Sequence, residues 1–83
     1  MKLIWVTEAE VYNEYILLLT FNDGCRKFFD CNILLEGGNA LYKPLQDTAV
    51  FREITLNGWT VTWNNGMIDV APEFLYEKGT PIQ

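Results

Sequence analysis

Asp69 and Glu73 are the pair of residues whose types and spacing come closest to a site for acid–base chemistry or for a hard cation. They stand on either side of a predicted junction between a strand and a helix, which would bring their carboxylates near each other. A structural role explains them more simply. Glu73 falls in the first turn of a helix, where the helix dipole favours a negative charge, and Asp69 would accept backbone N–H groups and cap that helix. We therefore expect neither a catalytic pair nor a metal site there.

The two thiols are the remaining candidates for nucleophilic chemistry. Cys25 and Cys31 flank a predicted strand, and an extended chain would hold their Cα atoms about 20 Å apart. A disulfide needs about 4.4–6.8 Å between Cα atoms. We expect both cysteines to be free and to serve in packing, not as a bridge, a metal pair or a nucleophile.

Two missing residue types limit the chemistry further. The chain contains no histidine and no serine, which excludes Ser-His-Asp and Cys-His arrangements and histidine-based metal sites. It has no G-x-G-x-x-G or P-loop pattern to hold a phosphate. The sequence predicts a protein that is not an enzyme, with no catalytic residue, no cofactor and no metal ligand.

Three tryptophans offer an aromatic surface. Trp59 and Trp63 lie two residues apart on a predicted strand and so share one face, to which Trp5 adds a third ring. Such rings either form a platform for a ligand or fill the core, and the spacing favours the core.

The composition points to a protein partner. The 83 residues make one domain, 1–83, in which 49% are hydrophobic and 14% aromatic, more than a small core readily buries. The net charge of −5 and the lack of a basic cluster beyond Arg26 and Lys27 argue against direct nucleic-acid binding and favour a basic protein partner or self-association. The longest apolar run, Ile16–Leu19, is too short for a membrane span, and with no signal sequence a cytoplasmic location is expected.

Turn signals predict a hairpin-rich antiparallel sheet. Asp23-Gly24, Asn57-Gly58 and Asn65-Gly66 are dipeptides typical of two-residue type I′ hairpins. About five to six strands are expected around them, over Leu3–Thr7, Tyr15–Phe21, Cys25–Asp30, Ile54–Leu56, Trp59–Trp63 and Met67–Val70. In the strand Trp59–Trp63, alternation predicts a buried face and a more polar face carrying Thr60 and Thr62. The strand Tyr15–Phe21 is apolar on nearly both faces, which suits either cover on both sides or a helix on one side and a partner on the other.

Two or three short helices are expected beside this sheet. Asp30 would cap Cys31–Glu36, Asp47 would cap Thr48–Arg52, and Pro72 would begin a last helix that ends before Gly79. We expect the tail 80–83 to fray. The predicted fold class is α+β.

Several fragments, in order, resemble the bacterial domain of unknown function 2442 family. They are the hairpin Leu19–Gly24, the segment Leu41–Leu45 followed by Asp47 and Phe51, and the ending Asp69–Tyr76, which reads D-V-A-P-E-F-L-Y. The resemblance implies a small α+β fold and no assigned activity. It also implies a second small protein as partner, in an arrangement of the toxin–antitoxin kind. Some longer relatives add a C-terminal helix-turn-helix; since this sequence runs only seven residues past Tyr76, we expect no such module and no direct operator binding.

We therefore predict a small protein-binding module, antitoxin-like in its capture of a small basic protein. The alternative is a domain that responds to a small molecule or a metal through the tryptophans or the Asp69 and Glu73 corner. The predicted partner surface is an edge strand together with Trp63, Asn65, Asp69, Glu73 and Tyr76. The simpler explanation of this corner is a turn and helix cap that only close the fold.

Overall fold

The computed structural model describes residues 3–82, and within them the chain forms two antiparallel sheets and several short helices. The larger sheet has the order β1-β2-β3-β7, with β1 (Val6–Asn13), β2 (Ile16–Phe21), β3 (Arg26–Asp30) and β7 (Thr80–Pro81). The smaller sheet has the order β4-β5-β6, with β4 (Thr55–Leu56), β5 (Val61–Trp63) and β6 (Ile68–Asp69). The helices are α1 (Asn32–Glu36), the 3₁₀ helix η1 (Ala40–Gln46), α2 (Thr48–Phe51) and α3 (Pro72–Lys78). The predicted α+β, hairpin-rich fold is confirmed.

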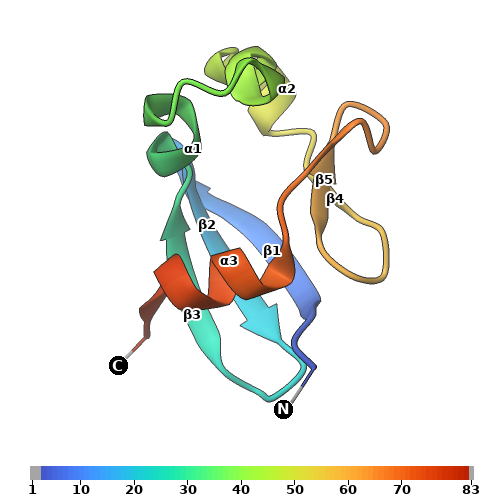
Figure 1. Cartoon of the computed structure of the whole chain (residues 1–83). Coiled ribbons are helices and arrows are strands. Elements are labelled where there is room, and N and C mark those ends of the chain that lie inside the picture. Colours follow the sequence, from blue (N-terminus) through green and yellow to red (C-terminus); the bar gives the residue numbers. More distant parts are fainter. Residues whose placement is uncertain (1–2, 83) are drawn as a thin grey trace.

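The helices cover one face of the larger sheet and one of its ends. In Figure 1, α3 crosses in front of β1, β2 and β3, α1 and α2 gather at the upper end, and the smaller sheet lies to the side. A single hydrophobic core fills the space between them. Its largest completely buried side chains are Trp63, Phe21, Phe29, Phe51, Leu17, Leu19, Leu45, Ile68 and Leu75.

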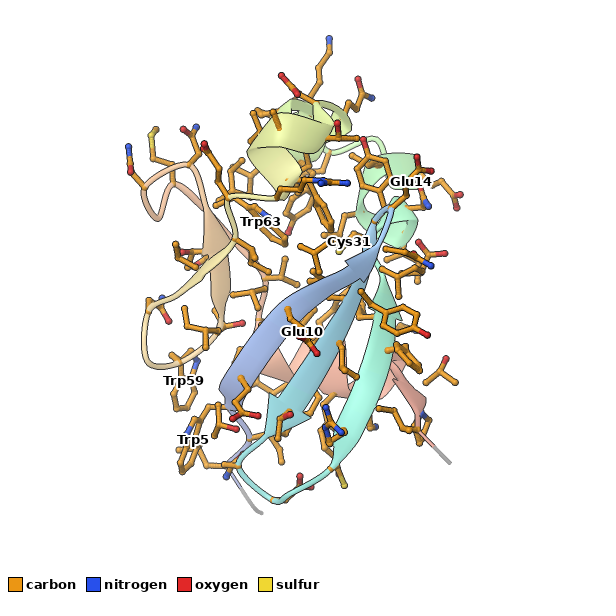
Figure 2. All side chains as sticks on the ribbon, turned by 180° about the vertical axis from the view of Figure 1, so that it is seen from behind. Trp5, Glu10, Glu14, Cys31, Trp59 and Trp63 are labelled. Atoms are coloured by element: carbon orange, nitrogen blue, oxygen red, sulfur yellow. The ribbon has the colours of Figure 1, made fainter. Side chains whose placement is uncertain are left out.

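The central strand β2 has one covered face and one open face. Leu17, Leu19 and Phe21 are buried, whereas the residues that alternate with them are only partly buried. Aromatic contacts attach α3 to the covered face, because the rings of Phe21 and Tyr76 lie 5.0 Å apart at their centroids. Seen from behind, no helix lies in front of β1, β2 and β3 (Figure 2). Of the two expectations for this apolar strand, the structure shows a helix on one face and an uncovered opposite face.

The first strand was misplaced by the sequence reasoning. We predicted it over Leu3–Thr7 with a connection through residues 8–14, but β1 runs from Val6 to Asn13 and pairs with β2. A turn at Glu14 and Tyr15, in which Tyr15 has φ 59°, joins the two strands. The acidic residues of β1 have low strand propensity, and cross-strand pairing overrides that preference.

The three predicted hairpins exist, but their turns are not the predicted two-residue type. At Asp23-Gly24 and Asn57-Gly58 only the glycine has a positive φ, at 86° and 87°. The third connection is longer, because Trp63 pairs with Ile68 across a loop of residues 64–67. There the first positive φ values belong to Asn64 and Asn65, at 55° and 58°. The dipeptides located the turns correctly but did not fix the loop length.

The smaller sheet confirms the predicted meander with shorter strands and one error. Thr60 and Thr62 were expected on a polar face, but both are buried. Their hydroxyl groups are paired inside the protein: Thr60 Oγ1 donates to the carbonyl of Val70, and Thr62 Oγ1 lies 2.8 Å from Thr55 Oγ1. Because both hydroxyl groups form hydrogen bonds inside the protein, burying them costs little free energy.

The helix predictions are mostly confirmed. The last helix spans Pro72–Lys78 as expected, and Asp47 caps α2 by accepting from Ala49 N at 2.9 Å. Asp30 is not the cap of α1, because Cys31 occupies that position without a side-chain bond. The expected fraying of the tail is wrong for residues 80 and 81, which form β7 against β3, while residue 83 lies outside the described residues.

Candidate functional site: an apolar groove at the corner of the fold

A shallow apolar groove of about 360 Å³ lies where α1, η1 and the start of α3 meet. Its walls are Ile33, Leu34, Gly37, Asn39, Tyr42, Val70, Ala71 and Phe74. Two of these large side chains remain open to solvent, Ile33 at 41% and Phe74 at 37% of their surface. The short helix α1 presents Ile33 outward while it buries Leu34 in the core. The groove is therefore a concave apolar surface that the fold itself leaves uncovered.

Two exposed acidic residues are neighbours in sequence of groove residues, although neither lines the groove itself. Asp69 ends β6 one residue before Val70, and Glu73 stands in the first turn of α3 one residue before Phe74. Partial burial, with a smaller effect of the nearby Asp69 charge, raises the pKa of the Tyr42 hydroxyl. Tyr42 also donates a long hydrogen bond of 3.5 Å to the carbonyl of Asp69. An apolar groove with the Asp69 charge close to Tyr42 suits an apolar side chain from a positively charged surface.

Trp63, one of the predicted partner-binding residues, is in the core. Its side chain has 0% exposure, its ring stacks on Phe51 at 5.8 Å, and its Nε1 donates to the carbonyl of Phe51 at 2.9 Å. It therefore closes the end of α2 from inside the protein and has no surface to offer a partner. Of the two roles considered for the tryptophans, filling the core is therefore the role of Trp63 but not of Trp59.

Trp59 and Trp5 form a separate aromatic pair at the surface. Their rings are stacked at 5.9 Å with an interplanar angle of 16°, and 38% of Trp59 is exposed. Figure 2 shows the two rings side by side near the start of β1, away from Trp63. The backbone of Val6 donates to the carbonyl of Trp59, so the pair fastens the smaller sheet to the larger one.

Tyr76 lies in a different cluster from the other predicted surface residues. Its hydroxyl donates to Asp23 Oδ2 at 2.7 Å and lies 3.6 Å from Cys25 Sγ. Lys27 Nζ lies 3.7 Å from the centre of the Tyr76 ring and donates to the Tyr76 carbonyl at 2.6 Å. The hydrogen bonds to Asp23 and Cys25 raise the pKa of the Tyr76 hydroxyl. These contacts fix α3 to the hairpin between β2 and β3.

None of the five predicted surface residues lines the groove; Asp69 and Glu73 come nearest in sequence, one residue before Val70 and Phe74. Asn65 is exposed in the loop after β5 and does not line the groove. Asp69 does not cap α3, whose N-cap is Ala71 without a side-chain bond. Within residues 3–82, no group of three or more potential ligand side chains is placed to hold a metal ion.

The cysteines are free in the structure. Cys25 is exposed and Cys31 is buried. Burial, together with the nearby Asp30 charge, raises the pKa of the Cys31 thiol, which suits packing and not reactivity. None of the helices in residues 3–82 has the length and apolar character needed to cross a membrane.

Sequence reasoning missed the residues that shape the groove. Ile33 and Tyr42 come from segments read only as a short helix and a connection, and no pattern in either segment marks an open surface. The usable signal was the surplus of large apolar residues, which predicted an exposed patch without locating it.

This combination of sheet, short helices and groove defines a small α+β protein with an open apolar corner. The chain belongs to the family described as "Protein of unknown function (DUF2442)", whose model matches residues 6–81. No curated protein and no solved structure matched the chain.

Proposed function

We propose that this protein is a cytoplasmic binding module that captures a basic partner protein by receiving an apolar side chain of that partner in the corner groove. One observation carries the proposal: Ile33 and Phe74 stay open to solvent in a concave apolar surface. Exposed apolar surface of this kind is characteristic of interaction sites.

The size and lining of the groove favour a side chain of a partner over a small-molecule ligand. Small-molecule pockets range from about 300 to 1,000 Å³ and carry convergent polar groups that orient the ligand. This groove lies near the small end of that range, at about 360 Å³. Its polar side chains are partly engaged already, since Asn39 caps η1 by accepting from Leu41 N at 2.9 Å.

The charge of the chain favours a basic partner. The net charge is −5, and the Asp69 charge lies close enough to the groove residue Tyr42 to contribute to the raised pKa of its hydroxyl. Complementary charge accelerates encounter and selects the partner, while the apolar contact in the centre supplies most of the affinity.

The test is a quantitative capture experiment with matched variants. The tagged wild type, I33K and L56K would each be incubated with lysate of the cells that encode the protein. Ile33 and Leu56 are exposed to nearly the same extent, 41% and 39%, but only Ile33 lines the groove. We expect one protein with a basic surface that the wild type and L56K retain and I33K loses. Equal recovery by all three would contradict the groove as the binding site.

The antitoxin-like role is a finer proposal that depends on this capture. The partner recovered in the first experiment would be expressed alone and together with this chain, with growth as the readout. Growth arrest that the wild type relieves and I33K does not would support it. If cells that express the partner alone grew normally, the antitoxin-like role would be refuted, and the protein would be a binding module with another role.

A further inference from the structure

The uncovered face of the larger sheet is a second surface, separate from the groove. Ile16 and Leu18 of β2 and Phe28 of β3 are only partly buried on this face, and Tyr12 of β1 has 59% of its surface exposed. The rings of Tyr12 and Phe28 meet across it at 4.7 Å. No helix covers this face, which is turned toward the viewer in Figure 2 with Glu10 upon it. Its centre is therefore apolar and open.

An acidic residue on β1 and a basic residue on β3 flank this face at the same position along the strands. Glu8 on β1 pairs in register with Thr20 on β2, and Thr20 pairs with Arg26 on β3. Glu8, Glu10 and Arg26 together with Leu18 and Thr20 line one depression of about 290 Å³, which confirms that they share the face. On this face β1 thus carries Glu8 and Glu10, while β3 carries Arg26 at the position of Thr20 and Asp30 at the position of Ile16.

This layout is complementary to itself. A twofold axis that runs along β2 in the plane between two stacked sheets would place β1 of one molecule over β3 of the other. Because that rotation keeps each residue at the same height, Glu8 would meet Arg26 of the second copy, and the second Glu8–Arg26 pair would form by symmetry. Leu18 would meet the second Leu18 at the centre. Two sheets packed face to face in this way lie about 10 Å apart, within reach of these long side chains.

We propose that the protein forms a face-to-face homodimer through this outer sheet face, with reciprocal Glu8–Arg26 ion pairs fixing the orientation. The inference is independent of the groove, whose residues lie on other elements. The occupant is a second copy of this chain because the same face supplies both the acidic and the basic half of each pair.

Pairing through the sheet edges is a poorer route to association. The exposed edge strand β1 is interrupted by register shifts between Val6 and Glu8 and between Val11 and Asn13. The opposite edge strand, β7, has only two residues, one of them Pro81. Irregular, charged and very short edge strands resist the addition of a further strand.

The size of the face predicts a weak dimer. Three strands of about six residues cover roughly 14 by 20 Å, or about 300 Å² in projection. Stable complexes bury about 800 Å² on each partner. We therefore expect a monomer–dimer equilibrium that appears only at high concentration.

The test is sedimentation velocity over about 10 μM to 1 mM protein, which brackets the weak affinities of small interfaces. The wild type should shift from monomer to dimer across this series. E8R and R26E should each stay monomeric, because each would place like charges opposite one another. R52E is the matched control, since Arg52 is exposed at the end of α2 outside the sheet face, and it should dimerise like the wild type.

Mixing the two variants decides the orientation. E8R with R26E should form a heterodimer, since every pair across the interface again joins opposite charges. Recovery on mixing also shows that both variants are folded. A wild type that stays monomeric throughout, a dimer that R26E leaves intact, or a mixture that stays monomeric would each overturn the proposal.

Discussion

Replacing Trp63 with phenylalanine tests whether this residue belongs to the core. Trp63 has 0% exposure, and its Nε1 donates to the carbonyl of Phe51 at 2.9 Å. That carbonyl lies at the end of α2, where a helix leaves carbonyl groups without partners in the helix. W63F therefore removes a buried hydrogen bond and leaves part of the indole volume empty.

The magnitude follows from these two losses. An unsatisfied buried carbonyl costs about 1–3 kcal/mol. Phenylalanine lacks about three heavy atoms of the indole ring, and at about 0.8 kcal/mol per buried methylene-sized group their loss adds about 2 kcal/mol. We expect W63F to lower the free energy of unfolding by about 3–5 kcal/mol, a large fraction of the stability of a small domain.

The assay is urea unfolding followed by far-ultraviolet circular dichroism, with W59F as the matched control. Trp59 has 38% of its surface exposed and stacks on Trp5 without a side-chain hydrogen bond of this kind. We expect W59F to cost less than about 1 kcal/mol, as surface substitutions generally do. If W63F and W59F lowered stability equally, the placement of Trp63 in the core would be refuted.

Two further predictions concern the thiols and Tyr76. Iodoacetamide should alkylate the exposed Cys25 in the folded protein and reach the buried Cys31, whose thiol pKa is raised by burial, only after unfolding; mass spectrometry showing equal rates at both would contradict this. The hydrogen bond to Asp23 raises the pKa of the Tyr76 hydroxyl above its usual value of about 10. The stability that this hydrogen bond contributes is therefore complete below about pH 10 and is lost as the pH rises through the folded-state pKa. The stability of the wild type should therefore fall more steeply above about pH 10 than that of Y76F, and parallel urea-midpoint curves for the two proteins would refute the link.

The sequence predicted well the elements with strong local signals. Pro72 and Gly79 set the limits of α3, Asp47 capped α2, and the glycine dipeptides located three connections, since each acts through its own backbone conformation. The strand β1 was misplaced because its acidic residues mask the alternation, and only pairing with β2 reveals it.

The candidate site was harder to predict because it depends on which apolar residues the fold leaves uncovered. Asp69 and Glu73 are exposed but do not line the groove, and Trp63, predicted at the surface, is buried by packing. Ile33 and Leu34 are neighbours of similar hydrophobicity and both line the groove, but the orientation of α1 leaves Ile33 exposed and buries Leu34. Such a difference arises from tertiary packing and leaves no mark in a single sequence.

The most direct test of the binding proposal is photo-crosslinking in the cells that encode the protein. A photo-reactive amino acid would be placed at position 33 in the groove and, as a matched control, at position 56 on β4. We expect one protein with a basic surface to be crosslinked from position 33 and not from position 56. No adduct from position 33, or the same adducts from both positions, would contradict the groove as the site of partner binding.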